Sequence, residues 1–358
     1  MLYREAGQFR TSYQADQAIF PIRQDRIGVL AILAFAFVVV PLIANEYWLQ
    51  AILIPFLALA VASIGQNILT GYAGQLSLGT GGFMAVGAYA TYKMMVAFPE
   101  VNIIILVLIS GVFSAGVGIL FGIPSLRIKG FYLAVATLAA QFFLIWMFNR
   151  VPWFYNYAPS GTITAPPRTT FGFMVTGPEA SAEARYLVCL AILAFLGLLA
   201  KNLVRSNVGR GWMAVRDMDV AAEIIGIRPF RTKLLAFAIS SYYCGVAGAL
   251  YFALYLGSVE TLAFEITLSF LVLFMVIIGG LGSILGSILG AAFIVILPIA
   301  LTNVPELLHL PISVSLAKQI EFMVFGGLII FFLVVEPLGL ARLWQIGKEK
   351  LRLWPFPH

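Results

Sequence analysis

Apolar blocks about as long as a lipid bilayer is thick follow one another along almost the whole chain. A transmembrane helix needs about 20 mostly apolar residues, because each helical residue rises about 1.5 Å across a hydrocarbon core of about 30 Å. Ten blocks approach that length, at residues 27–44, 49–64, 77–96, 103–123, 131–148, 186–200, 234–256, 266–278, 284–301 and 320–335. We therefore expect an all-α integral membrane protein, a polytopic bundle of about ten transmembrane helices.

Composition excludes an ordinary water-soluble fold. Only 11% of the 358 residues are charged and 61% are hydrophobic, against about 25% charged in a typical soluble domain. The first apolar block follows 26 residues that contain four arginines and no apolar core, so we expect it to remain as the first span rather than to be a cleaved signal. The two cysteines lie inside apolar blocks, where a thiol behaves as a small buried hydrophobe.

The basic residues predict the orientation of the bundle. If the N-terminus is cytoplasmic and every block crosses the membrane, 17 of the 22 Lys and Arg residues lie on the cytoplasmic side, in keeping with the positive-inside rule. This topology divides the chain into a cytoplasmic N-terminal segment (1–26), a transmembrane domain (27–336) and a cytoplasmic tail (337–358). Its long polar connections are an outer loop at 149–185 and an inner loop at 201–233. The net charge of +6 then reflects membrane orientation rather than nucleic-acid binding.

The outer loop interleaves prolines with aromatic residues. Five prolines and six aromatic residues lie between 149 and 185. Aromatic residues gather at membrane surfaces, so one interpretation is a plain connecting loop at the interface. The other is a docking surface for an external partner.

Charged groups are missing from the middle of the apolar blocks. Ion-coupled transporters, pumps and intramembrane enzymes need ionisable side chains at membrane depth to carry protons, bind cations or activate a nucleophile. The sequence also has no G-x-x-x-x-G-K-[ST] phosphate loop. We therefore expect no catalytic, metal or cofactor site and no nucleotide site of its own. Uphill transport would need another protein to supply the energy.

The inner loop contains a short helix signal. Residues 209–251 read GRGWMAVRDMDVAAEIIGIRPFRTKLLAFAISSYYCGVAGALY, with Asp217 or Asp219 as candidate N-cap and Gly226, followed by Pro229, as the stop. The stretch closely resembles the coupling loop and following span of the branched-chain amino acid ABC transporter permeases of the LivM type. In that family the loop helix docks in a groove of the cytoplasmic ATPase.

Two further segments carry the same resemblance. Residues 67–89, NILTGYAGQLSLGTGGFMAVGAY, are similar to the family's first-half signature, and residues 279–290, GGLGSILGSILG, are similar to its second-half glycine motif. The likeness extends from about residue 27 to residue 335. At 80–82 the sequence departs from the family, which often has His or Gln and small residues after S-L-G.

The resemblance implies a type II ABC importer permease in the bacterial inner membrane. It implies a homologous second permease subunit, two cytoplasmic ATPase subunits and a periplasmic binding protein as partners, with a branched-chain amino acid or a similar small polar solute as cargo. We expect the ATPase-docking residues to be Arg210, Arg216, Asp219, Ala222, Glu223 and Gly226. The alternative is a facilitator or channel that needs no ATPase, for a solute such as urea. The inner loop favours the importer, because a channel has no need of it.

The two glycine segments have physical interpretations of their own. Polar side chains accompany the first at membrane depth, where an interrupted helix is tolerated only if protein buries it or water lines it. They are candidates for lining the translocation path: Asn67, Thr70, Gln75, Ser77 and Thr80. In the second segment, Gly282, Gly286 and Gly290 recur every fourth residue, so we expect them to share one helix face that lets a neighbouring helix approach closely.

Overall fold

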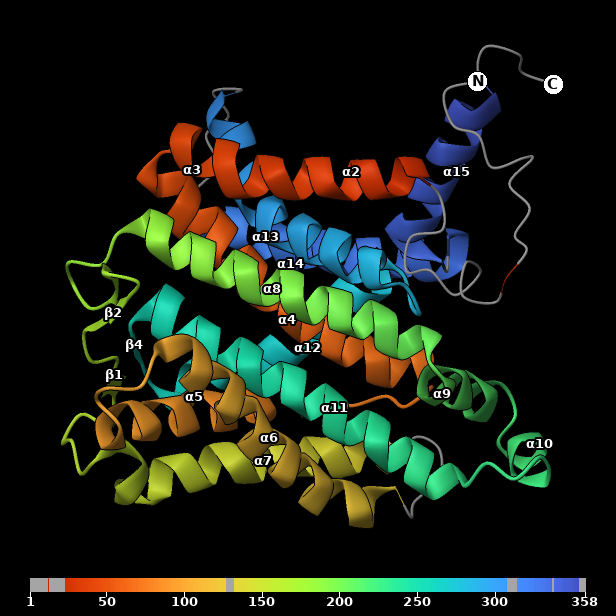
Figure 1. Cartoon of the computed structure of the whole chain (residues 1–358), viewed down its shortest axis with the longest axis horizontal. Helices are drawn as coiled ribbons and strands as arrows, with labels where there is room; N and C mark the ends of the chain where they lie inside the picture. Colours follow the sequence, from red (N-terminus) through yellow and green to blue (C-terminus); the bar gives the residue numbers. More distant parts are fainter. Residues whose placement is uncertain (1–11, 13–22, 127–131, 308–313, 337, 354–358) are drawn as a thin grey trace.

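The computed structural model describes residues 12, 23–126, 132–307, 314–336 and 338–353, most of which are helical. The helices lie side by side in one bundle, with short strands at one end and short helices at the other (Figure 1). The first half contains α2 (Arg23–Ala34), α3 (Val40–Ile43), α4 (Ile54–Asn67), α5 (Thr80–Ala97), α6 (Ile103–Ser125) and α7 (Tyr132–Arg150). The second half contains α8 (Ala182–Arg205), α9 (Asn207–Asp217), α10 (Asp219–Ile224), α11 (Pro229–Leu250), α12 (Ile266–Gly279), α13 (Ile284–Leu307), α14 (Val314–Val335) and α15 (Gly339–Leu353).

Shorter helical segments extend or join these helices. Those with π geometry are η1 (Phe35–Val39), η2 (Trp48–Leu53), η3 (Ile68–Tyr72) and η5 (Tyr251–Leu256), and those with 3-10 geometry are η4 (Pro152–Tyr155) and η6 (Thr261–Phe264). As a result, several spans are longer than their α-helical part. The second span, for example, runs without a break from Trp48 to Tyr72.

Among the described residues, eight helices are long and apolar enough to cross a bilayer. They are Asp25–Ile43, Trp48–Tyr72, Ile103–Ser125, Tyr132–Arg150, Ala182–Arg205, Pro229–Leu256, Thr261–Gly279 and Ile284–Leu301. Each overlaps one of the ten apolar blocks, which confirms the polytopic all-α architecture. The two remaining predicted crossings fall on α5, which is rich in glycine, and on α14, whose apolar helix Met323–Phe332 is shorter.

The centre of the bundle is α4, in which every residue except Phe56 is buried. Next to it, α5, α6 and α11 pack closely because small residues meet at their crossings. A Cβ atom at Gly87 would run into the backbone of Gly245, and one at Gly248 would run into the backbone of Met84. Small residues let membrane helices gain van der Waals contact along their backbones. The fit therefore depends on glycine at these crossings.

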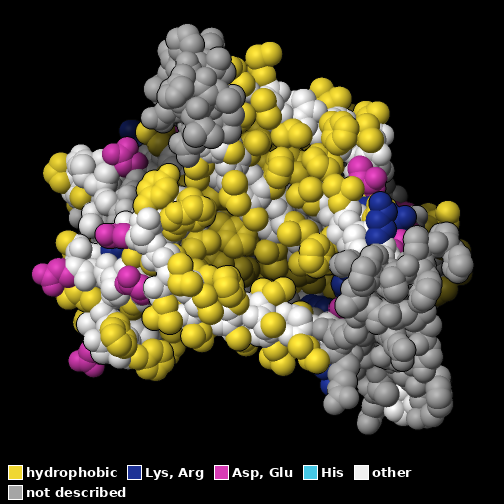
Figure 2. All heavy atoms as spheres, turned by 90° about the horizontal axis from the view of Figure 1, so that it is seen from above, with side chains coloured by type: hydrophobic (Ala, Val, Ile, Leu, Met, Phe, Trp, Pro, Cys, Tyr) yellow, Lys and Arg dark blue, Asp and Glu magenta, His cyan; other side chains and the backbone are white. Residues whose placement is uncertain are grey.

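The outside of the bundle is apolar over a wide area. Figure 2 shows one such face, with acidic side chains gathered at one end and Lys and Arg side chains towards the other. On the first span Leu42 is 81% and Ile43 is 78% exposed, and on α14 Met323 is 77% exposed. Exposed apolar surface on this scale is expected where lipid or a second membrane subunit covers the helices.

One end of the bundle carries the short strands. Ile163–Thr164 (β1) pairs antiparallel with Ser258–Val259 (β4), and Arg168–Thr170 (β2) pairs antiparallel with Phe173–Thr176 (β3). The predicted outer loop is therefore folded against the connection that follows η5. The β2–β3 hairpin turns at Phe171, which has a positive φ and is 86% exposed.

The opposite end carries α9, α10 and α15 (Figure 1). Lys348 of α15 forms an ion pair with Asp25 of α2, with 2.9 Å between Nζ and Oδ1. The start of the first span and the last described helix therefore meet at the same end. The two long polar connections, 149–185 and 201–233, lie at opposite ends of the bundle, as the charge pattern predicts.

Candidate functional site

Two neighbouring helices form the compact unit that the inner loop predicts, here called the α9–α10 unit. Ser206 caps α9 by accepting a hydrogen bond from the Val208 N–H at 3.2 Å. The chain is extended at Met218, and α10 begins at Asp219. Neither predicted N-cap is found, because Asp217 ends α9, Asp219 is already helical, and Met218 stands at the cap without a side-chain hydrogen bond.

The end of α10 agrees with the sequence-based prediction. Gly226 has φ +90°, and its N–H donates to the Glu223 carbonyl at 3.0 Å. The N–H of Ile227 donates to the Ala222 carbonyl, also at 3.0 Å. These two bonds make a Schellman motif, which satisfies the last carbonyls of a helix and requires a left-handed residue. Glycine at this position therefore fixes where α10 stops.

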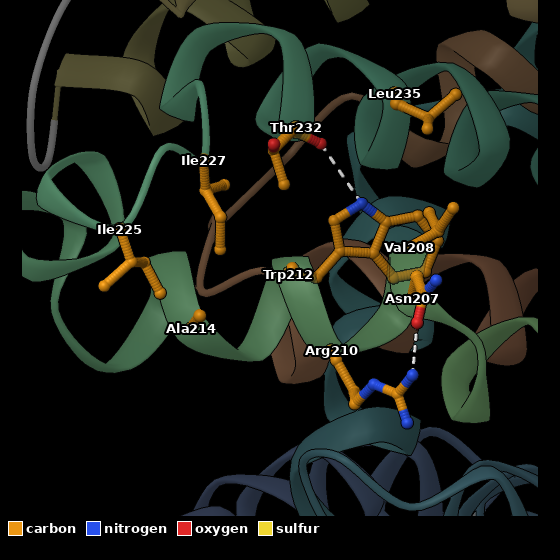
Figure 3. Close-up of a pocket in the computed structure, with 10 residues that line it drawn as sticks. Asn207, Val208, Arg210, Trp212, Ala214, Ile225, Ile227, Thr232 and Leu235 are labelled. Carbon is orange, nitrogen blue, oxygen red and sulfur yellow. Dashed lines mark hydrogen bonds between the residues drawn. The ribbon is translucent and has the colours of Figure 1, made fainter.

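Buried contacts hold the unit against α11. Trp212 is fully buried, and its indole N–H donates to the Thr232 carbonyl at 3.1 Å (Figure 3). Ala222 of α10 is also buried, and Asp219 lies 3.9 Å from Lys233 of α11. A groove of about 430 Å³ remains beside the indole, bordered among others by Ile227.

The outer face of α10 is apolar although it lies outside the membrane spans. The exposed side chains are Met218 (65%), Val220 (64%), Ile224 (82%) and Ile225 (72%). A cluster of exposed apolar side chains on a polar segment typically marks a protein contact. The charged Glu223, which was predicted from the sequence to dock, is exposed beside them. The four apolar side chains themselves were not predicted. The sequence did contain this signal, because four large apolar residues lie close together in a connection outside the apolar blocks.

Of the two predicted docking arginines, Arg210 is exposed and bonds Asn207 of its own helix. Arg216 is also exposed, with 36% of its side-chain surface accessible, but its guanidinium bonds a distant segment. Its Nη1 donates to the Gly71 carbonyl at 2.8 Å, and its Nε donates to Asp217 at 2.9 Å. Arg216 therefore contacts the first glycine segment of its own chain, a contact that was not predicted, and its docking to the ATPase stays a prediction.

The first glycine segment interrupts the helix as predicted. The second span ends at Tyr72, α5 begins at Thr80, and residues 73–79 are not helical. The five candidate path residues lie together around this break. Four of them are buried, and Thr70 is partly exposed.

Gln66 is the centre of this cluster and was missed by the sequence analysis. Its Nε2 donates to the Ser77 carbonyl at 2.8 Å and to the Thr70 hydroxyl at 3.1 Å, and its Oε1 accepts from the Thr80 hydroxyl at 2.7 Å. An amide one turn before Thr70, just after the apolar block 49–64, was the available signal. The buried Oε1 of Gln75 has no hydrogen-bond partner among the described residues.

Asn67 connects the two glycine segments. Its Nδ2 donates to the carbonyl of Ser283 at 2.9 Å and to the hydroxyl of Ser287 at 2.7 Å. Its Oδ1 accepts from the N–H of Gly282 at 2.8 Å, and Nδ2 also lies 3.2 Å from the carbonyl of Gly280. The Asn67 side chain thus supplies hydrogen-bond partners for backbone groups of the turn between α12 and α13.

The buried start of α5 is satisfied from other helices. Gly79 at its N-cap has no side chain, so the free N–H groups need outside acceptors. Gly81 donates to the hydroxyl of Ser269 of α12 at 2.8 Å, and Gly82 donates to Oε1 of Gln141 of α7. The Gln141 Nε2 donates to the Phe264 carbonyl at 2.7 Å. Gln141, like Gln66, was not singled out from the sequence.

The second glycine segment packs α13 against α12, with one correction. A Cβ atom at Gly286 would strike the backbone of Gly279, and one at Gly290 would strike the backbone of Met275. Gly282, however, lies in the turn before α13 with φ +75°, and not on the helix face. The four-residue period crosses the start of the helix, so Gly282 serves the turn instead.

The described residues contain no group of three or more His, Cys, Asp or Glu side chains that could hold a metal ion. The two cysteines, Cys189 and Cys244, are both free and buried within spans.

Comparison with known proteins agrees with this architecture. Residues 48–333 match the family described as branched-chain amino acid transport system, permease component. The chain is 30% identical over 300 residues to the high-affinity branched-chain amino acid transport system permease protein LivM of Escherichia coli, covering 78% of this chain and 67% of that protein. It is 27% identical over 303 residues to the probable branched-chain amino acid transport permease protein LivM of Methanocaldococcus jannaschii, covering 79% and 81%. No solved structure matches the chain. The chain therefore belongs to the permease-component family of branched-chain amino acid transport systems.

Proposed function

We propose that the chain is the membrane-spanning permease subunit of an ATP-driven importer for branched-chain amino acids or similar small polar solutes. It works in the bacterial inner membrane with both termini in the cytoplasm, beside a homologous permease subunit. Two cytoplasmic ATPase subunits drive it, and a periplasmic binding protein delivers the solute. Family membership supports this assignment, and so does the absence of a phosphate loop from the sequence.

The observation that carries the proposal is the exposed apolar face of α10. Met218, Val220, Ile224 and Ile225 project from a helix of six residues that is held rigidly by Trp212 through α9. A rigid element that ends in an apolar surface suits transmission of a push from a partner protein. A channel that opens without ATP needs no such surface.

The translocation path is proposed to pass the helix break at 73–79. A break buried by other helices is tolerated in a membrane and commonly marks a transport site. In this structure the Gln66 amide bonds groups on both sides of the break and the Asn67 amide bonds the 280–287 segment, whereas the buried Oε1 of Gln75 has no partner among the described residues. Passage of a solute would therefore require the Gln66 and Asn67 bonds to rearrange.

The outer end is proposed to receive the binding protein, with aromatic side chains as the contact. Phe171 and Phe173 of the hairpin are 86% and 67% exposed. The arginines of this segment have other roles. Arg168 is buried and donates to the carbonyls of Met95 and Phe98 at the end of α5, where a cation is favourable. Arg185 donates to the Gly177 carbonyl at 2.6 Å.

Reconstitution tests the proposal. The chain, its partner permease and the ATPase subunits are placed in liposomes with loaded binding protein outside, and uptake of labelled leucine is measured with ATP inside. We expect accumulation above the outside concentration, and none when the ATPase subunits carry an inactivating substitution. Equilibration without ATP, to the same level inside and outside, would instead establish a facilitator.

A further inference from the structure

The guanidinium of Arg216 occupies the point where three chain segments meet. Its Nε and Nη2 both bond the Asp217 carboxylate, at 2.9 and 2.8 Å. This pairing orients the planar group and leaves Nη1 to donate to the Gly71 carbonyl at 2.8 Å. Arg216 thereby joins the last turn of α9 to the last turn of the second span.

Three glycines lie close to Arg216 or to the segment that it bonds. Gly74 has φ +67°, and a Cβ atom there would lie 2.7 Å from the Arg216 Cγ. A Cβ atom at Gly71 would collide with the Asn67 Oδ1 and with the N–H of Gly282, the two groups that bond each other. Gly282 has φ +75°, which favours glycine, and a Cβ atom there would lie 3.6 Å from the Arg216 Nη1, at ordinary contact distance. Segment 71–74, at the end of the second span, and segment 280–283, before α13, thus meet beside the same guanidinium, and we call these two segments the junction.

The junction extends further through the second loop. A Cβ atom at Gly280 would lie 3.1 Å from the Ala341 Cβ and would collide with the Leu338 carbonyl. A Cβ atom at Gly339 would meet the backbone of Ile278 and Gly280. A displacement at Arg216 would thus be felt by the ends of the second span and α12, and by the start of α15.

The α9–α10 unit has two covalent connections to the spans, to α8 through Ser206 and to α11 through residues 226–228. Neither connection leads directly to the helix break at 73–79. The Arg216 contact does, because Gly71 and Gly74 border that break. We propose that Arg216 is a positioning residue that relays movement of the α9–α10 unit to the junction and so to the helix break. This inference rests on the proposed function, because it presumes that a partner moves the unit.

The functional test compares Arg216→Ala, Arg216→Lys and the control Arg231→Ala, which removes an exposed cation at the start of α11. We expect Arg216→Ala to copurify with the ATPase subunits, to keep basal ATP hydrolysis, and to lower uptake per ATP hydrolysed at least about tenfold. A charged hydrogen bond of about 1.5 to 3 kcal/mol corresponds to about 10- to 100-fold. Arg216→Lys should recover part of the loss, because an ammonium group can reach the Gly71 carbonyl. The control should behave as the unmodified protein.

Three outcomes would overturn the relay. The first is unchanged uptake per ATP in Arg216→Ala, and the second is loss of the ATPase subunits from that variant, which would make Arg216 a docking or folding residue. The third is that the losses caused by Arg216→Ala and Asp217→Ala simply add in the double variant, because two residues of one relay should not act independently. Absence of ATP-driven uptake in the unmodified complex would count against the proposed function instead.

A distance measurement tests the contact on the full chain without partners. Spin labels at Val220→Cys and Leu76→Cys, both exposed positions, report on the α9–α10 unit and on the helix break. The native Cys189 and Cys244 are buried and leave the new thiols to react selectively. We expect one narrow distance distribution, which broadens in Arg216→Ala and stays narrow in the Arg231→Ala control. An equally narrow distribution in Arg216→Ala would rule out the relay even where transport is not measured.

Discussion

At the scale of single residues, Asn67 offers a sharp test, because one buried amide serves as both donor and acceptor for the 280–287 segment. Asn67→Ala leaves these groups without partners, at a cost of about 1 to 3 kcal/mol for each buried group. Asn67→Asp should be worse, because a carboxylate cannot donate to the carbonyls and carries a charge into the bundle. Thermal unfolding followed by size-exclusion chromatography in detergent should rank the proteins as unmodified, then Ala, then Asp.

Gln50→Ala is the matched control for Asn67, because its amide bonds only Glu46 at an exposed position. Loss of such a surface contact should change stability by less than about 0.5 kcal/mol. If Asn67→Asp were as stable as the unmodified protein, the amide would not hold the second glycine segment.

The residues that were predicted well are those whose role is local in sequence. Gly226 could be predicted as the end of α10, because the left-handed conformation depends only on the residue type at that position. Gly282 was placed wrongly, because a four-residue period does not reveal where a helix begins. The bond from Arg216 to the Gly71 carbonyl was not predicted, because a charge does not reveal which carbonyl it faces. Gln66 and Gln141 were missed because their partners lie on other segments, far away in the sequence or across the helix break.

At the scale of elements, a substitution at Gly226 tests the role of the Schellman motif that ends α10, because it introduces backbone strain without a steric clash. A Cβ atom at Gly226 would meet nothing within 4 Å, so a substitution there acts only through the backbone at φ +90°. Gly226→Val should cost about 1 to 3 kcal/mol in local strain and reorient α10. Gly226→Asn should be milder, because asparagine tolerates the left-handed region. Substrate-stimulated ATP hydrolysis and uptake should both fall in the valine variant and survive in the asparagine variant.

Combining Gly226→Val with Glu223→Lys should impair uptake more than either change, since both alter the surface that α10 presents. Unmodified uptake by the double variant, in a complex that assembles normally, would remove the coupling role of α10.

The helices themselves were predictable, because a span is recognised from the length of its own apolar block. The strands at the outer end were not, because two- to four-residue strands depend on pairings such as Ile163 with Val259.

At the scale of the whole molecule, the outer end is acidic. Its exposed carboxylates are Glu46, Glu100, Glu179, Glu183, Glu260 and Glu265. They outnumber the cations, of which Arg150 is exposed, Lys93 and Arg185 are partly exposed and Arg168 is buried. A binding protein that docks here should therefore present a basic face, which would speed capture at low salt.

The last prediction follows from that charge. Replacing Glu179, Glu183 and Glu260 by Gln should raise the Kd for loaded binding protein at low ionic strength and flatten its dependence on salt, because exposed charges are screened beyond about 10 Å at 0.1 M. Surface plasmon resonance on the complex in nanodiscs measures the Kd and its dependence on salt. The salt series runs from roughly 20 to 500 mM, the range over which screening sets in. Glu349→Gln at the opposite end is the control and should change neither. An unchanged salt slope in the triple variant would leave docking to the apolar hairpin side chains Phe171 and Phe173 alone.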